Sequence, residues 1–242
     1  MSKKILTIIM IMLLIFPIFL SADDDFIDDT NRYIDELIMM TDALADDAIS
    51  IVDGHFTIFY HNNKIKAEGP VKKSKKDGEW KIYYDNPENK MIMAKGIYRL
   101  DLKNGQWITY YPNGKTMMKA MYRNSELNGQ IFLYTDEGLP LAEIVYKNHM
   151  KNGVFRSYYP KGNPKEISMF KNDKRDGVQN LFYPNGKKKS LGQYKDGIKT
   201  GLWKFFYETG KIQSEGNYVR DEKSGKWKIF DENGMIIETE NY

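Results

Sequence analysis

The stretch Gly105-Gln-Trp-Ile-Thr-Tyr-Tyr-Pro-Asn-Gly-Lys115 has the pattern of a strand, a tight turn and the start of a second strand, and Tyr122 follows it. The pattern recurs along most of the 242-residue chain at steps of 24 residues, with one step of 27. Its eight copies begin at Gly54, Gly78, Gly105, Gly129, Gly153, Gly177, Gly201 and Gly225. Repetition at such a fixed period is typical of stacked supersecondary units. The repeat is therefore the unit that decides the fold.

The residues that follow each repeat glycine predict a strand with two apolar faces. Side chains of a strand alternate between the faces of a sheet, so the second, fourth and sixth residues after the glycine share one face. The second residue is aromatic or aliphatic in seven copies, with Gln179 as the exception, and the sixth is Tyr in six copies. The fifth residue, on the opposite face, is aromatic in all eight copies. Each face is thus predicted to carry a column of rings.

The rest of each copy predicts a hairpin and a link to the next copy. Asn and Gly at the turn, as in Asn113-Gly114, tolerate the positive φ that a tight hairpin needs. The second strand places small residues such as Gly192 and Gly216 where rings of a neighbouring strand can stand over them. A six-residue charged loop, for example residues 171–176, is predicted before the next glycine. The predicted fold is mainly β, an elongated, twisted antiparallel meander of about eight hairpins.

The motif Gly-x-Trp-x-x-Tyr-Tyr-x-x-Gly-Lys, followed by a Tyr and a charged loop, resembles the bacterial variant of the MORN (membrane occupation and recognition nexus) repeat. Proteins with this repeat are often labelled YwqK-type antitoxins. The resemblance covers residues 54–242 and all eight copies. It implies an elongated antiparallel sheet and a binding role, with membrane binding and antitoxin-like activity as further readings.

Two segments precede the repeats. Residues 1–22 have the pattern of a signal peptide, in which Lys3 and Lys4 precede the apolar run 5–20 and cleavage is expected near Ala22. An uncleaved membrane anchor is the competing reading, but a spanning helix needs about 20 residues. Residues 23–53 predict one acidic amphipathic helix that caps the repeat array, with a partner-binding or oligomerising helix as the alternative. Its formal net charge is −10, against +11 for residues 54–242. The chain is thus expected to be exported to a periplasm, a cell envelope or the medium.

The sequence contains no pattern that indicates catalysis. His55, His61 and His149 lack metal-ligand spacing, and the absence of cysteine excludes disulfides. No nucleophile elbow or phosphate-binding loop is present, and no carboxylate pair recurs at one repeat position. We therefore expect no enzyme activity, cofactor, metal or small-molecule substrate.

Two surfaces are candidates for binding. The first is a basic edge formed by the charged loops, with Lys72, Lys73, Lys75, Lys76, Lys147, Lys151, Lys171, Lys174, Arg175, Lys195 and Lys199. The second is an aromatic strip formed by Tyr83, Tyr110, Tyr134, Tyr158, Phe182 and Phe206. The basic edge fits an anionic membrane surface or an acidic protein, or it is a solvated edge that prevents aggregation. Nucleic acid is not expected. The predicted function is a non-catalytic exported scaffold for protein–protein interaction at the cell envelope; the alternatives are a peripheral membrane-binding module and an antitoxin-like binding protein.

Overall fold

The computed structural model describes residues 32, 34–39, 49, 51–85 and 90–242. The chain divides into two compact units, residues 1–101 and 102–242, and the boundary lies inside the repeat region. In the described part of the chain, seventeen strands account for most of the repeat region. Within each unit consecutive strands pair antiparallel, except that β3 and β4 both pair with β2. The predicted mainly β, antiparallel meander is confirmed.

Unit 1 contains a short meander and a helical segment. Its strands are β1 (Gly54–Phe59), β2 (Ile65–Lys72), β3 (Lys75–Lys76), β4 (Gly78–Tyr83) and β5 (Ile92–Arg99). The described residues of the predicted helix, 32 and 34–39, are helical. Ile34 and Leu37 are buried, whereas Asp35 and Met39 are exposed, so the predicted apolar face is confirmed for these residues. Its capping role stays a prediction.

The remaining predictions for the N-terminus fall on residues that the structure does not describe. The signal peptide at 1–22, the alternative anchor at 5–20 and most of the helix predicted within 23–53 lie outside the described residues. Among the described residues, no helix has the length and apolar character needed to cross a bilayer.

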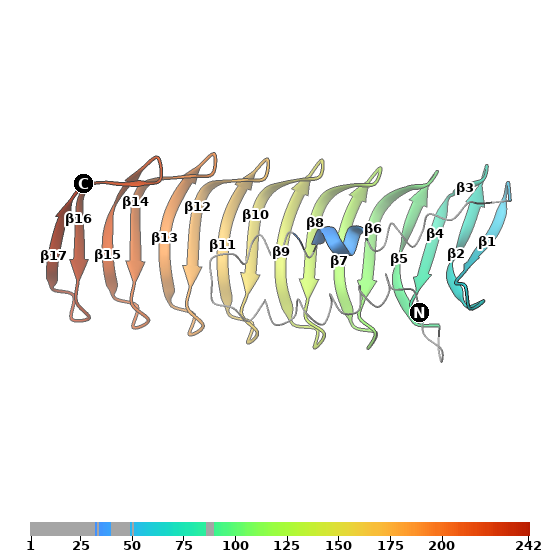
Figure 1. Cartoon of the computed structure of the whole chain (residues 1–242), viewed down its shortest axis with the longest axis horizontal. Helices are drawn as coiled ribbons and strands as arrows, with labels where there is room; N and C mark the ends of the chain where they lie inside the picture. The colour runs from blue at the N-terminus through green and yellow to red at the C-terminus, as the bar shows by residue number, and fades with distance from the viewer. Residues whose placement is uncertain (1–31, 33, 40–48, 50, 86–89) are drawn as a thin grey trace. The chain divides into compact units, whose positions relative to one another are not determined.

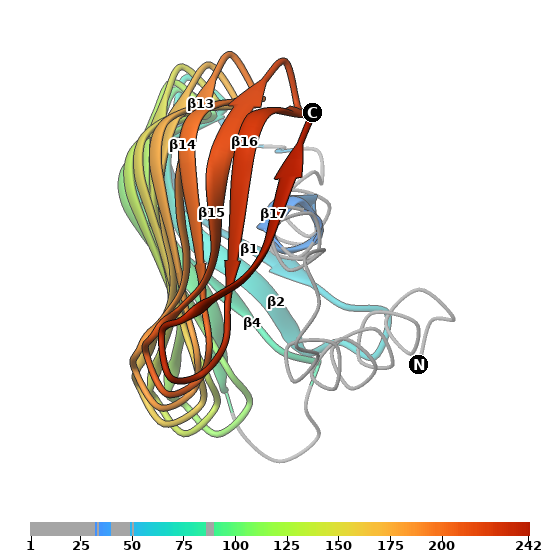
Figure 2. The same cartoon turned by 90° about the vertical axis from the view of Figure 1, so that its left-hand side faces the viewer.

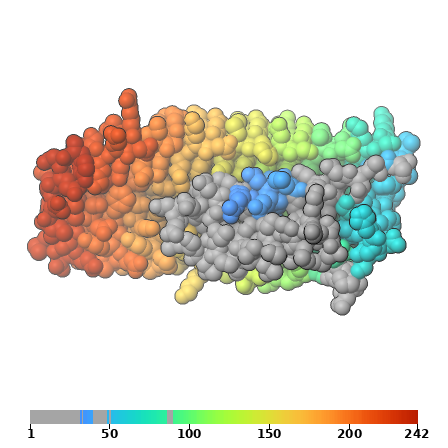
Figure 3. All heavy atoms as spheres, in the orientation of Figure 1, coloured from blue at the N-terminus to red at the C-terminus, as the bar shows by residue number. Residues whose placement is uncertain are grey.

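Unit 2 is a meander of twelve strands (Figure 1). They are β6 (Leu102–Tyr110), β7 (Thr116–Arg123), β8 (Glu126–Tyr134), β9 (Pro140–Lys147), β10 (Met150–Tyr158), β11 (Pro164–Lys171), β12 (Lys174–Phe182), β13 (Lys188–Lys195), β14 (Ile198–Phe206), β15 (Ile212–Val219), β16 (Glu222–Phe230) and β17 (Ile236–Asn241). Viewed along the array, its strands share one bent profile, so each hairpin nearly repeats the one before it (Figure 2). The side chains of β12 to β17 form a closely packed surface (Figure 3).

The links between copies differ from the six-residue loops that the sequence predicts. Each link is a two-residue turn, and the flanking residues belong to the strands: Lys171 ends β11 and Lys174 begins β12. Asn172 and Asp173 have φ values of 48° and 65°, the left-handed conformation that a two-residue hairpin turn requires. Asn and Asp tolerate this conformation, so the chain reverses without a loop. The prediction of loops was wrong, and most first strands have nine residues.

The repeat glycine lies at a bulge inside these long strands. In β10, Lys151 pairs with Tyr146 and Phe155 pairs with Ile144, so two extra residues stand opposite β9. Gly153, within this bulge, has a φ of 138°, and an added Cβ would lie 2.9 Å from the Cβ of Val145. Backbone conformation and close approach of the neighbouring strand therefore both select glycine here.

The predicted packing of rings over small residues is confirmed. A Cβ built on Gly192 of β13 would lie 2.1 Å from the indole of Trp203 in β14, and Gly216 and Trp227 make the same arrangement. Trp203 is 2% exposed and packs edge to face against Tyr194 and Tyr218. Glycine thus lets each indole lie directly on the neighbouring backbone.

The tyrosine at the sixth position joins consecutive hairpins. Its hydroxyl donates a hydrogen bond to the main-chain carbonyl of the fifth residue in the next copy, with oxygen–oxygen distances of 2.7 to 2.8 Å. The donors are Tyr60, Tyr111, Tyr159, Tyr183 and Tyr207. Burial, with a contribution from Asp85, raises the pKa of Tyr60 to about 12. These five hydrogen bonds fix five of the hairpin turns relative to the next.

Candidate interaction surfaces

We call the side of the sheet that carries the tryptophans face A, and the opposite side face B. Face A is largely closed: Trp80, Trp107, Phe155, Trp203 and Trp227 are all buried. Face B carries the rings of the fifth position, which are mostly half-buried. The two faces therefore differ in what they can offer to a partner.

Face A also holds a row of cations that comes from the predicted basic loops. We call the six residues before each repeat glycine, except the first, a linking segment; each contains a two-residue turn. Six of the seven linking segments have a Lys or Arg at their fifth position. In every case the charged group lies 4.7 to 5.9 Å from the centre of at least one aromatic ring. The six are Lys76, Lys103, Lys151, Arg175, Lys199 and Lys223. A cation over a ring face is attracted by the ring quadrupole.

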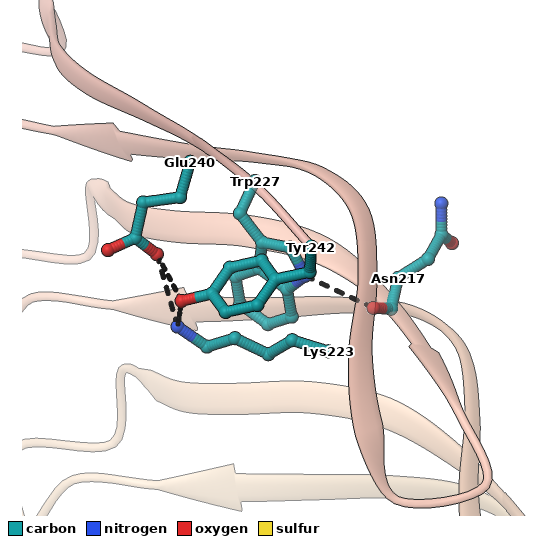
Figure 4. Close-up of polar contacts among 5 residues, drawn as sticks. All are labelled: Asn217, Lys223, Trp227, Glu240 and Tyr242. Atoms are coloured by element: carbon teal, nitrogen blue, oxygen red, sulfur yellow. Dashed lines mark hydrogen bonds and ion pairs between the residues drawn. The ribbon is translucent and has the colours of Figure 1, made fainter.

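Figure 4 shows the last of these sites. The Lys223 ammonium lies 4.7 Å from the ring centres of both Trp227 and Tyr242, and it donates a hydrogen bond of 2.8 Å to the Tyr242 hydroxyl. Its distance to a Glu240 carboxylate oxygen is 3.4 Å. The hydrogen bond to Tyr242, together with Glu240, raises the pKa of Lys223. The Trp227 indole N–H donates to the carbonyl of Asn217 at 3.1 Å. The cation is therefore part of the packing of face A.

The basic edge predicted from the sequence therefore has fewer exposed members than expected. Lys76 and Lys151 are buried, at 7% and 8% exposure, and Arg175 and Lys199 also lie on face A. The exposed members are Lys72, Lys73, Lys75, Lys147, Lys171, Lys174 and Lys195. The seven linking segments have a formal net charge of +8, to which the six cations on face A contribute +6. Apart from these six cations, the linking segments carry a net charge of +2, and three of the six, Arg175, Lys199 and Lys223, are half-exposed.

The predicted aromatic strip is partly open. Tyr83 is buried and donates a hydrogen bond to Glu68, and burial raises its pKa well above the usual range. The rings of unit 2, namely Tyr110, Tyr134, Tyr158, Phe182 and Phe206, are half-buried on face B. Exposed aliphatic side chains of β11 to β15 lie on the same face: Met169, Val178, Ile198, Leu202 and Val219. Face B of unit 2 therefore exposes apolar side chains that a partner can reach, and the Lys204–Glu215 ion pair lies on the same face.

A lysine cluster that the sequence reading missed lies on the hairpin turns of unit 2. Segments 159–165, 183–189 and 207–213 each comprise a hairpin turn and the first two residues of the strand that follows it, and together they carry six lysines and one carboxylate, Glu208. The lysines are Lys161, Lys165, Lys187, Lys188, Lys189 and Lys211, and we call them the hairpin lysine patch. The run Lys187-Lys188-Lys189 is the signal that could have found it. Taken alone, Asn185-Gly186-Lys187 predicts only a hairpin turn.

One copy interrupts the rings of face A with polar groups. Gln179 stands where four other copies have Trp, and it pairs with Gly192 on one side and Ser168 on the other. The same Glu166 oxygen accepts hydrogen bonds from Ser168, from Gln179 at 2.9 Å and from Arg175 at 3.4 Å. Three donors satisfy this oxygen of Glu166, so the buried polar groups of the cluster satisfy one another. The Glu166 carboxylate is therefore structural and not a reactive group.

The described residues contain no group of three metal-ligating side chains. Together, the fold and surfaces define the class of protein as an antiparallel β-repeat scaffold with one closed and one open face. The model of the MORN repeat variant family matches residues 52–73, 103–124, 151–172, 175–196, 199–220 and 223–242, more than half of the chain. The chain therefore belongs to the MORN repeat variant family, whose members are commonly protein- or membrane-binding scaffolds and generally not enzymes.

Two of the eight predicted copies lie outside the matched residues. The copy from Gly78 is three residues longer than the others, and the copy from Gly129 has Ile131 and Thr135 in place of Trp and Tyr. Both nevertheless form the same hairpin as the other copies, β4 with β5 and β8 with β9. The hairpin therefore tolerates changes at these positions.

No curated protein matches the chain. Among solved structures, two that match are described as crystal structures of TcdB2-TccC3-Cdc42 and TcdB2-TccC3. Each is 9% identical, covers 76% or 74% of this chain, and has a TM-score of 0.21. This chain spans 12% of the length of those chains. A TM-score of 0.21 is too low to support a common fold.

Proposed function

We propose that the protein is an exported, non-catalytic scaffold that binds a protein partner at the cell envelope through face B of unit 2. The observation that carries this proposal is the group of exposed aliphatic side chains on the face that also carries Phe182 and Phe206. Val178 is 39% exposed and Leu202 is 51% exposed, although the face opposite them is closed. Exposed apolar patches of this kind mark interaction sites, and aromatic side chains anchor many of them.

The charge distribution favours a protein partner over a membrane. Attraction to anionic lipid contributes about 1 kcal/mol for each Lys or Arg near the surface. In the linking segments, Lys76, Lys103 and Lys151 are buried, and Lys195 forms a 2.9 Å ion pair with Asp176. The peripheral membrane-binding alternative therefore loses part of the charge on which it rested.

The N-terminal sequence supports the proposed location. The signal-like pattern of residues 1–22 would direct the chain out of the cytoplasm. An antitoxin-like protein that neutralises a cytoplasmic toxin would need to remain there. We therefore propose that the partner is an envelope protein.

Photocrosslinking in intact cells tests the proposal. A photoreactive residue at Val178 should give an adduct with one discrete envelope protein. The double substitution Ile198→Lys/Leu202→Lys should reduce this adduct roughly tenfold, because it places two charges in the apolar interface. Both positions are exposed, so the fold should be nearly unchanged.

The matched control is Met235→Lys/Ile237→Lys, which changes two exposed aliphatic residues away from β11 to β15. It should leave the adduct at its original level. Equal losses in the two variants, or adducts formed only with lipid or with cytoplasmic proteins, would contradict the proposal.

A further inference from the structure

We propose that the hairpin lysine patch of unit 2 binds a short acidic segment of a polypeptide. The inference rests on the proposed protein-binding function, but it concerns a different surface and names the chemistry of the partner. The patch occupies the turns between β10 and β15, whereas the apolar surface lies on face B.

The patch is the most one-sided concentration of charge on the hairpin turns of unit 2. Its three segments carry a net charge of +5, because six lysines stand beside Glu208 alone. Lys161, Lys187, Lys188 and Lys211 are exposed. Throughout the described residues, no carboxylate lies within 4.0 Å of these four ammonium groups. Their charge is therefore available to an anionic ligand.

The turns that carry the patch are held in fixed positions relative to one another. Tyr159 and Tyr183 donate hydrogen bonds to main-chain carbonyls of the next hairpin. Asn163 and Asn185 do the same from the turns, at 2.8 and 3.0 Å, and the Lys187 ammonium donates to the carbonyl of Thr209 at 2.8 Å. A preorganised row of cations loses less conformational freedom on binding than a flexible one.

The extent of the patch fits a short extended segment. Adjacent strands are about 4.8 Å apart, so the six strands β10 to β15 span roughly 24 Å. An extended chain of about seven residues has this length. Acidic side chains along such a segment can meet lysines on all three turns.

The neighbouring turns argue against a membrane as the ligand. The turn before the patch carries Asp136 and Glu137, and the turn after it carries Asp231 and Glu232. A flat anionic surface on this edge would bring these carboxylates close to lipid phosphates and repel them. No large hydrophobic side chain is exposed on the three segments of the patch, so no side chain of the patch would insert into a bilayer. A seven-residue segment covers the basic turns alone.

Binding of a fluorescent heptaglutamate peptide to the full chain, measured by anisotropy, tests the inference. The wild-type protein should bind it, and rising salt should weaken binding because the contacts are electrostatic. The variant Lys161→Glu/Lys188→Glu/Lys211→Glu should raise Kd roughly tenfold or more, since three exposed ion pairs are replaced by repulsions. A heptaglutamine peptide should not bind.

The control Lys147→Glu/Lys171→Glu/Lys174→Glu changes the net charge equally, at exposed residues of the linking edge. Because these lysines lie outside the patch, the control should raise Kd less than about threefold, although it changes the total charge by the same amount. Equal losses in both variants, or no binding of heptaglutamate, would overturn the inference. Patch-dependent binding of phosphatidylserine vesicles without peptide binding would also overturn it, in favour of a membrane ligand. The Val178 crosslink is a separate readout, so its persistence would show that only the further inference had failed.

Discussion

Gly192→Ala should lower the free energy of unfolding by about 3 kcal/mol, because the added methyl group overlaps a buried indole. The Cβ would lie 2.1 and 2.2 Å from two ring carbons of Trp203. This indole has little room to move: it packs against Tyr194 with ring centres 5.3 Å apart, and it stacks on Phe205 at 6.1 Å. Either the ring or the strand β13 must shift. Urea-induced unfolding measures the loss.

Gly186→Ala separates this overlap from a general effect of losing glycine. Gly186 lies in a hairpin turn with a φ of 81°, and an added Cβ would meet no atom within 4 Å. It should cost only about 1 kcal/mol, the price of a left-handed conformation for alanine. If Gly192→Ala cost no more than Gly186→Ala, the packing of rings on glycine would not stabilise the array.

The second large effect concerns the cations of face A. Lys199→Glu should destabilise the protein by about 3 kcal/mol, because it replaces a cation by a carboxylate that faces aromatic rings. The Lys199 ammonium lies 5.1 Å from the Trp203 ring centre and 5.3 Å from that of Tyr218. Lys199→Met keeps the apolar stem and loses only the charge, so it should cost about 1 kcal/mol.

Lys171→Glu is the matched control, because Lys171 is an exposed lysine of the neighbouring linking segment. It should change stability by less than about 0.5 kcal/mol. Similar losses for Lys199→Glu and Lys171→Glu in urea-induced unfolding would mean that the two lysines have the same surroundings.

The sequence predicts the hairpins well, because its signals there are local. The turn glycines, the alternation of ring positions and the small residues of the second strand each follow from steric rules that act over a few residues. Gly192 under Trp203 is an example in which residue size alone indicates the contact. The tyrosine hydrogen bonds could not be predicted, since their acceptors are carbonyls 23 residues away.

The link between copies was mispredicted because charged residues suggest a loop. Asn172-Asp173 closes the chain in two residues, so β11 and β12 continue through most of the predicted loop. Once the strands continue, alternation places Arg175 beside Phe170 and Tyr194 on face A. A Lys or Arg recurs at the same position of six linking segments, and this recurrence was the available signal for packed cations. Cations of a solvated edge would not need to keep one position.

The two candidate surfaces were predicted only in part, because strand alternation is local whereas solvent exposure depends on the folded array. The aromatic column of face B follows directly from strand alternation, and five of its six predicted members are half-buried. Which lysines remain in solvent depends on strand length, bulges and turn type together. The hairpin lysine patch was missed because its charges are spread over three turns that are adjacent only in the folded array.

The folded sheet divides its lysines between face A and solvent. Acetylation of the native protein by an amine-reactive ester, followed by mass spectrometry of each lysine, tests it most directly. Lys103 and Lys151, which are 3% and 8% exposed, should react much more slowly than the exposed Lys147, Lys171 and Lys188. Equal reaction rates for Lys151 and Lys147 would show that both lysines face solvent and would contradict the account.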